Sequence, residues 1–480
     1  MAARLLKAGA IPARLTFAAG ATAPAAAPAS LNAARFCKPL AAFFLVFGGT
    51  LTLGCADHAS HTLPARTALD AGHGDQALAA LDKELEVDRP EDVPPKIESD
   101  KVLFLLDRAM VLNQLERYKL VSRDLEIADK SLEILDFKRG TQDEIGKYLF
   151  SDETGPYRAP AYEKLLVNTI NMECYLARGD LSGARIEARR LSVLERFFHD
   201  TGDAGEKLMG PGDYLAGFIF EKSGQPQEAL RYYDSALSLG TYDSLTEPLA
   251  RLASQSSYRS PRIEKLLANG GDVKTPPADS AEILVVINYG RVPAKIAERI
   301  PIGLALTYAS GAISPFDQDR ANRLAAQGLV TWVNFPRLGK PHGTYDFPKF
   351  GVDGRVEALD NALAIDVAAK QAWDAVQGKV VASAITRTIT RILAGQVVQK
   401  ATGNGLTGFL LGLGTQATMT ATDTPDTRSW STLPARIAIG RVRVPAGQHT
   451  VELVSRGVHK KAVVNLEPGG WSMVMLTVLR

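Results

Sequence analysis

The stretch from Gly217 to Ala236, GFIFEKSGQPQEALRYYDSA, decides the fold class of the first half of this chain. Its apolar residues recur at spacings of three and four, and helix-forming residues dominate on both sides of it, from residue 60 to residue 260. This periodicity is typical of amphipathic helices and not of strands. The sequence therefore predicts a helical domain, which we place at residues 63–260.

The same stretch resembles the tetratricopeptide consensus, in which small residues let paired helices approach and glycine makes the turn between them. Its positions are filled by Gly217, Phe220, Gly224, Ala229, Tyr233 and Ala236. Weaker copies place Ala77, Val121 and Ala184 at the position of Ala229, with separations of 44, 63 and 45 residues. The consensus period is about 34 residues. The resemblance therefore implies irregular repeats with insertions.

Stacked helix pairs of this kind build a solenoid with a concave groove that usually binds peptides or proteins. The alternative is a generic helical bundle that only supports the next domain. Glu163 and Glu187 could flank a polar groove, but a solvated helix face is the favoured interpretation. Cys174 lies in an apolar helical pattern, so we expect a small buried hydrophobe rather than a catalytic thiol.

The first 54 residues have the features of a targeting segment. The apolar run from Pro39 to Gly54 follows Arg35 and Lys38, as in a secretory signal peptide. The run has 16 residues, whereas a helix that spans a bilayer needs about 20. We therefore assign residues 1–54 to a signal peptide.

The end of this run, Leu51-Thr-Leu-Gly-Cys55, resembles the lipobox of bacterial lipoproteins. The resemblance implies cleavage before Cys55, acylation of its thiol, and a lipidated tether over residues 55–62. Ala56 matches the pattern that sorts such proteins to the outer membrane, here the periplasmic face in a Gram-negative bacterium. A plain secretory signal with an accidental cysteine, or an uncut membrane anchor, are the alternatives.

The composition excludes several function classes. The chain has a formal charge of +2, and five basic and no acidic residues lie within residues 1–55, so the remainder carries −3. A chain without a basic surplus is not expected to bind nucleic acid. The motifs HExxH, CxxC, GxSxG and GxxxxGK[ST] do not occur in the sequence. We expect no cofactor, no metal site and no catalytic residue.

Residues 278–480 predict an α+β domain of antiparallel strands. Glu282–Asn288 and Lys295–Ile300 are strand candidates, as are Leu304–Tyr308 and Gly328–Val333. A helical hairpin is expected over residues 356–417, with its first helix over Val356–Gln377. Alternating residues predict a four-stranded antiparallel meander over residues 435–480.

The apolar stretch 379–414 allows more than one interpretation. A buried helical hairpin that covers the sheet is favoured, while contact with a membrane or self-association are the alternatives. Residues 403–408 formally spell GxGxxG, but they follow a helical run and not a strand, so they fail as a dinucleotide fingerprint.

The segment Asp426-Thr-Arg428-Ser-Trp430 with Leu433-Pro434 precedes strands that resemble PEGA-type surface β units. Together with the lipobox and the repeats, this DTRSWxTLP segment resembles an uncharacterised family of bacterial envelope lipoproteins. The family implies location and fold but no reaction. Asp426, Arg428 and Trp430 are expected to tie helix to sheet through an ion pair and ring stacking, and His449 is expected on a strand surface.

These observations predict a lipid-anchored envelope protein that acts as an adaptor or assembly factor. Its partners would be envelope proteins bound in the helical groove, and the membrane through Cys55. An envelope enzyme, such as a peptidoglycan or polysaccharide hydrolase, is one alternative. A secretion component for surface polymers, with self-association through residues 379–414, is another.

Overall fold

The computed structural model describes residues 57–97, 100–137, 157, 159–201, 209–269, 277, 279–326, 332–340, 342, 345–360, 363–401 and 424–480. All of them belong to one compact unit, Gly54–Arg480. The predicted signal peptide, Cys55 and the glycine-rich stretch 403–414 lie outside the described residues. Within the described ranges, no helix combines the length and the apolarity that a bilayer crossing requires.

Helices form the N-terminal half and sheets form the C-terminal half, as predicted. Consecutive helices pack as pairs because apolar and small residues recur along one stripe of each helix. The pairs are α2 (His58–Asp70) with α3 (Gly74–Glu84), α4 (Lys101–Gln114) with α5 (Tyr118–Phe137), α6 (Ala161–Ala177) with α7 (Leu181–Thr201), and α8 (Gly210–Lys222) with α9 (Pro226–Leu239). They are followed by η4 (Asp243–Leu245), α10 (Thr246–Gln255) and α11 (Pro261–Asn269).

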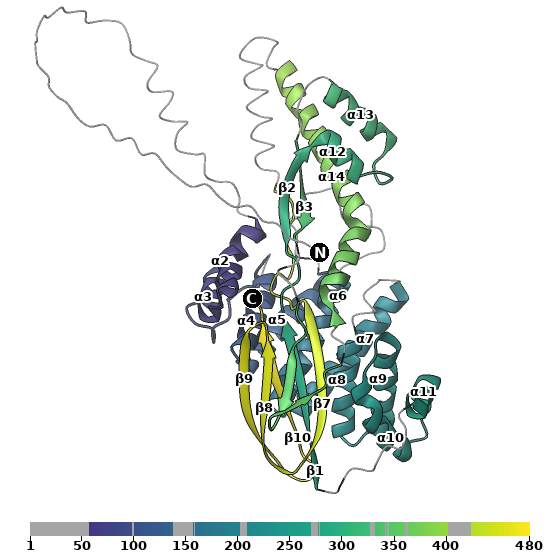
Figure 1. Ribbon diagram of the computed structural model, residues 1–480. Coiled ribbons are helices and arrows are strands. Elements are labelled where there is room, and N and C mark those ends of the chain that lie inside the picture. The colour runs from purple at the N-terminus through teal and green to yellow at the C-terminus, as the bar shows by residue number, and fades with distance from the viewer. Residues whose placement is uncertain are drawn as a thin grey trace, which may run out of the picture. The chain divides into compact units, whose positions relative to one another are not determined.

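The strands form two four-stranded sheets and a two-stranded ribbon (Figure 1). The first sheet has the order β10–β1–β7–β6, with the bounds β10 (Trp471–Val478), β1 (Ser280–Tyr289), β7 (Arg436–Pro445) and β6 (Leu363–Ala364). The second has the order β5–β4–β8–β9, with the bounds β5 (Arg355–Glu357), β4 (Lys349–Val352), β8 (Gly447–Ser455) and β9 (Val458–Leu466). The ribbon pairs β2 (Lys295–Pro301) with β3 (Trp332–Leu338).

The central strand β1 is buried on both faces, which explains its uninterrupted apolar sequence. Leu284 and Val286 belong to a core shared with the helices. Ile283, Val285 and Ile287 belong to a core shared with the second sheet. Helices, first sheet and second sheet therefore form three layers around β1.

A third core joins the β2–β3 ribbon to α12 (Ile302–Tyr308), α13 (Pro315–Ala326) and α14 (Ile365–Ala401). Ile385, Ile389 and Ile392 face it from α14, as their helical spacing predicts. We call these five elements the distal module. In Figure 1 the module extends beyond the end of the two sheets.

Two predicted elements of the C-terminal half are wrong. Leu304–Tyr308 is helical and not a strand, because Ile302, Ala305 and Ala309 recur with a helical period and pack into the core of the module. The helix expected from residue 356 begins at Ile365. The preceding residues form the β4–β5 hairpin, whose turn places Asp353 and Gly354 at φ values of 51° and 78°.

The predicted meander over residues 435–480 is also wrong in its pairing. The four strands exist, but β7 and β10 both pair with β1, while β8 and β9 lie in the second sheet. The pair β1–β10 is parallel, so the domain is not purely antiparallel. The reason is that β1 carries apolar residues on both faces and can be buried only between two strands and two layers.

The predicted helical insertion, residues 356–417, does not cover the sheet in its described part. α14 packs against α12 and the ribbon instead, and residues 402–417 lie outside the described residues. The predicted domain boundaries differ as well. α2 begins inside the predicted tether 55–62, and one core contains residues from both 63–260 and 278–480.

Candidate functional site

The inner face of the helix pairs, formed by α4, α6 and α8, is covered by the chain's own first sheet. Every residue of α8 from Gly210 to Glu221 is buried. The ring of Phe218 on α8 meets the edge of Trp471 on β10, with 5.4 Å between the ring centroids. The surface that a tetratricopeptide groove would offer to a partner is therefore occupied within the molecule.

Buried hydrogen bonds connect this inner face to the sheet half. The Asp107 carboxylate on α4 accepts from the backbone N–H of Thr432 at 2.9 Å and from its hydroxyl at 2.8 Å. The hydroxyl of Thr477 on β10 donates to Asn113 Oδ1 at 2.6 Å. Because all four residues are buried, loss of either partner leaves a polar group without water.

A third connection contains an ionisable group in apolar surroundings. Asn288 Nδ2 on β1 donates to Glu173 Oε2 on α6 at 2.6 Å, while Glu173 Oε1 has no hydrogen-bond partner. Burial raises the pKa of Glu173 to about 8, although the bond from Asn288 opposes the rise. The carboxyl is therefore largely protonated at neutral pH.

An ion cluster joins α8 to β1 and β7. Arg441 on β7 donates to Glu221 at 2.7 Å and to the Tyr233 hydroxyl at 2.8 Å, and it pairs with Glu282. Burial alone would raise the pKa of Glu221, but Arg441, Lys222 and Arg251 outweigh it and lower the pKa below its usual range. The carboxylates stay charged, and the cluster holds sheet to helices.

The segment Asp426–Trp430 lies where helices and sheet half meet. Arg428 donates to Asp426 at 2.8 Å and to Asp100, beside the start of α4, at 3.3 Å. Trp430 is fully buried, and its backbone N–H donates to Glu163 on α6 at 3.2 Å. Arg428 and Trp430 thus connect this segment to the helical half, while Asp426 holds Arg428. No ring stacking of Trp430 occurs among the described aromatic pairs.

The six residues assigned to repeat packing lie together at the α8–α9 turn and between these helices. A side chain at Gly217 would meet the ring of Tyr233 at 2.4 Å, so only glycine permits this approach. Gly224 has a φ of 70°, which glycine adopts without strain. Phe220, Ala229 and Ala236 are buried between or beside the two helices.

Glu163 and Glu187 are neither solvated nor in an open groove, so the favoured prediction for them is wrong. They are 1% and 3% exposed. Glu187 accepts from Asn168 Nδ2 at 2.9 Å, and burial raises the pKa of both carboxyls. The helices that carry them are covered by neighbouring elements, which their local sequence does not reveal.

The surroundings of Cys174 and His449 are those of residues with a structural role. Cys174 is fully buried, and burial raises the pKa of its thiol well above the usual value, so the thiolate nucleophile does not form there. His449 is mostly buried instead of lying on the strand surface. Its ring bonds Asp353 at 2.7 Å and the Pro445 carbonyl at 2.8 Å. The described residues contain no cluster of side chains suited to a metal ion.

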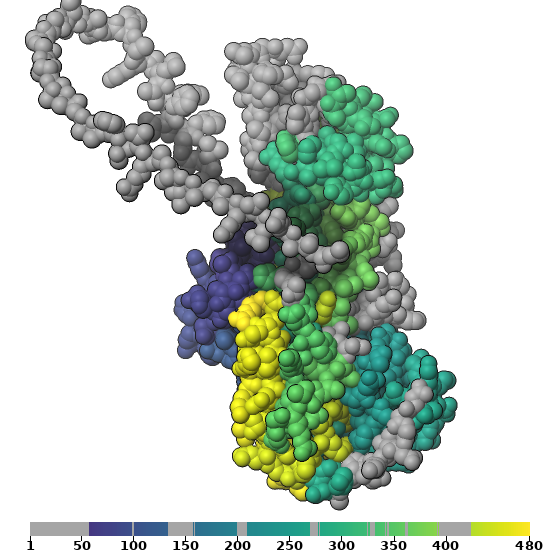
Figure 2. All heavy atoms as spheres, viewed as in Figure 1, coloured from purple at the N-terminus to yellow at the C-terminus, as the bar shows by residue number. Residues whose placement is uncertain are grey.

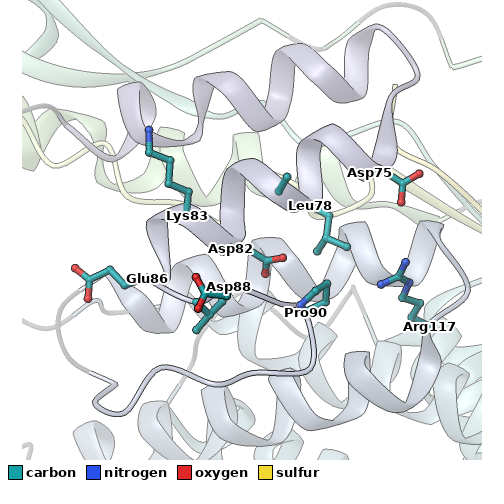
Figure 3. Close-up of a pocket in the computed structure, with 10 residues that line it drawn as sticks. Asp75, Leu78, Asp82, Lys83, Glu86, Asp88, Pro90 and Arg117 are labelled. Carbon is teal, nitrogen blue, oxygen red and sulfur yellow. The ribbon is translucent and has the colours of Figure 1, made fainter.

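Within the described residues, an open hollow lies on the first helix pairs, and we call it the α3 hollow (Figure 3). It has a volume of about 750 Å³ and lies between α3, the following loop and the α4–α5 turn. Its lining consists of Asp75, Leu78, Ala79, Asp82, Lys83, Glu86, Val87, Asp88, Pro90 and Arg117. Three exposed carboxylates and two exposed cations surround a small apolar floor, so the lining carries charges of both signs.

Two arginines hold one wall of the α3 hollow in place through hydrogen bonds. Arg108, fully buried on α4, donates to Asp82 at 2.9 Å and to the Asp92 carbonyl at 3.2 Å. Arg123 on α5 donates to the Pro90 carbonyl at 2.7 Å. The loop is thus held in place without a ligand, which lowers the ordering cost of binding.

The sequence predicts insertions between the repeats but does not indicate that this loop lines a site. The usable signal was Arg108, which lies within the largely apolar helical run Val102–Leu112. A buried arginine requires carboxylates or carbonyls nearby, so it predicts a fixed polar loop even before the partners are known.

Comparisons with known proteins add little to this geometry. No protein-family model matches the chain, and no curated protein matches it. Among solved structures, the chain is similar to one described as "Crystal structure of MamA", with 14% identity and a TM-score of 0.23. The match covers 42% of this chain and 85% of that one, and a TM-score this low carries no structural argument.

Proposed function

We propose that this chain is a lipid-anchored adaptor or assembly factor on the periplasmic face of the outer membrane, with no catalytic role. The observation that carries the proposal is the α3 hollow, an open site of about 750 Å³ on the helical half. Anchoring through Cys55 is supported by the lipobox-like sequence alone.

In this proposal the helix pairs are degenerate tetratricopeptide-like repeats forming a short solenoid. The contact between Gly217 and the Tyr233 ring and the left-handed Gly224 support that assignment. The solenoid uses its inner face to hold the sheet half. Partners would therefore bind its outer surface, in the α3 hollow, and not the predicted groove.

The hollow favours a protein partner with a polar segment over an apolar small molecule. Asp75, Lys83, Asp88 and Arg117 are exposed at its rim, while Leu78 forms part of its floor. Exposed charges of both signs contribute more to partner choice and association rate than to affinity. Charge reversal should therefore change which proteins are bound.

The test is crosslinking in intact envelopes followed by partner identification, with the complete chain. Asp75→Lys with Asp88→Lys should lower the yield of the specific crosslink at least fivefold. Glu228→Lys with Glu264→Lys, on exposed positions outside the hollow, is the matched control and should leave the yield unchanged.

Equal yields from the two double variants would contradict the proposed site. The complete chain is needed because residues 56–260 alone would expose the apolar inner face of α4, α6 and α8. Such a fragment would capture proteins through a surface that is buried in the molecule.

A further inference from the structure

The tip of the distal module exposes large apolar side chains. Leu304 and Tyr308 on α12 are 47% and 45% exposed, Phe316 on α13 is 63% exposed, and Trp332 at the start of β3 is 38% exposed. Leu304 and Tyr308 are one helical turn apart and share a face. Trp332 pairs with Pro301, so it lies at the same end of the ribbon as the start of α12.

Arginines accompany the exposed rings. The guanidinium of Arg299 lies 5.5 Å from the centroid of the Trp332 ring, and that of Arg320 lies 4.8 Å from the centroid of Phe316. Aromatic rings beside arginines are typical of surfaces at the boundary between lipid and water, where rings enter the headgroup region and guanidinium groups meet phosphates.

The end of the distal module nearest the sheets, which we call its root, lies close to the first turn of α2. Thr427 accepts a hydrogen bond from the backbone N–H of Ala59 in the first turn of α2, at 3.1 Å. Two residues later, Ser429 accepts from the backbone N–H of Lys295 at the start of β2, at 3.3 Å. The first turn of α2 and the root of the ribbon are therefore neighbours.

A lipid anchor at Cys55 would lie within reach of this root. Cys55 precedes Asp57 by two positions, and two residues of extended chain span at most about 7 Å. The seven residues of β2 carry the module tip about 23 Å from the root. In Figure 1 α12 lies farther from the two sheets than α2 does, and Figure 2 shows the surface of the module.

We propose that the tip formed by α12, the start of α13 and Trp332 is a second, non-covalent contact with the lipid bilayer. This inference rests on the proposed anchor, which would bring the bilayer to the root of the module. Because the tip lies about 23 Å from the root, both contacts form when the ribbon lies along the bilayer surface. Leu304, Tyr308 and Phe316 enter the headgroup boundary, and Arg299 and Arg320 meet lipid phosphates. Two contacts would fix the orientation of the protein on the membrane.

The test uses residues 56–480 without the lipid, because every described helix, strand and core cluster lies within this range. The protein is sedimented with vesicles of phosphatidylethanolamine and phosphatidylglycerol, and separately with vesicles of phosphatidylcholine alone. Wild type should bind the first at least tenfold more tightly than the variant Leu304→Ser with Phe316→Ser, and should bind phosphatidylcholine more weakly.

The matched control is Ile186→Ser with Val193→Ser, which removes equally exposed apolar side chains from α7. It should bind vesicles as wild type does, and circular dichroism should show that both variants are folded. No vesicle binding by wild type, or equal loss in both variants, would overturn the proposal. So would dimerisation in sedimentation velocity that only the tip variant abolishes, because the tip would then bind a second copy.

A separate measurement tests the proposed lipid anchor at Cys55. Palmitate labelling of cells that express the full chain should be present for wild type and absent for Cys55→Ala. If labelling is equal, the anchor is refuted, whereas the vesicle experiment still decides whether the tip binds lipid.

Discussion

At the scale of single residues, the small side chains of the helix pairs decide how closely the helices pack. Gly217 faces the ring of Tyr233, and Gly183 faces the ring of Tyr175 at an equally short distance in the preceding pair. Tyr233 cannot move away easily, because its hydroxyl bonds both Glu221 and Arg441. The glycine–tyrosine contact is therefore a sterically fixed point of the fold.

Replacing Gly217 with alanine should destabilise the protein by about 2 kcal/mol, since the added carbon overpacks a core that cannot relax. The measurement is the free energy of unfolding from urea titration. Gly303→Ala is the control, because no atom lies within 4 Å of that position and its helical site is exposed. Alanine there should stabilise by about 0.5 kcal/mol. A Gly217→Ala protein as stable as wild type would refute the assigned role.

At the scale of elements, α6 and β1 show which structural features a local sequence pattern predicts and which it does not. Their apolar spacing predicts a helix and a buried strand, and both form. The contact between Glu173 and Asn288 joins residues 115 positions apart, so no local pattern reveals it. Only the packing of the two elements turns Glu173 into a buried acid with a pKa of about 8.

The raised pKa of Glu173 makes stability depend on pH in a defined window. Between its ordinary value of 4.5 and about 8, the folded protein keeps a proton that the unfolded chain releases. The contribution of Glu173 to stability is therefore lost as the pH rises through this window, by at most about 1.4 kcal/mol per pH unit.

Glu173→Gln should remove this dependence, because glutamine keeps an acceptor for Asn288 and does not ionise. Urea titrations at pH 5 and pH 8.5 should show the variant gaining stability relative to wild type at the higher pH. Glu264→Gln, on an exposed position of α11, should follow wild type at both values. A constant difference between Glu173→Gln and wild type would show that the buried carboxyl does not titrate as described.

At the scale of the whole molecule, the helical half and the sheet half form one folding unit. They share a core, and the Arg441 cluster, the Asp107–Thr432 bonds and Arg428 connect them at separate places. This arrangement uses the inner face of the helices internally. Within the described residues, the α3 hollow and the tip of the distal module stay exposed.

Arg441→Met should cost about 3–5 kcal/mol, because it leaves Glu221 and Glu282 buried without their shared cation. Helix content and tryptophan fluorescence should still change in one coincident transition during denaturation. Lys461→Met, which breaks an exposed pair with Glu452, should cost less than about 1 kcal/mol. Equal effects of the two substitutions would contradict a clamping role for the cluster.

The sequence by itself determined the helical character of the described part of residues 60–260 and the existence of the four terminal strands. These features depend on local periodicity, which each segment carries in its own residues. The sequence singled out Arg428 and Trp430, but their partners Asp100 and Glu163 lie 328 and 267 positions away and were found only in the tertiary structure. It also pointed to Cys55 as a lipid site, which stays a prediction. The tertiary structure alone decided that the sheet fills the inner face of the helices, that β7 and β10 flank β1, and that Glu163 and Glu187 are buried. Each of these depends on partners more than a hundred residues away or on layers stacked from both halves. The physical reason is that apolar surface is buried only when all the layers are assembled, so no single segment carries that information.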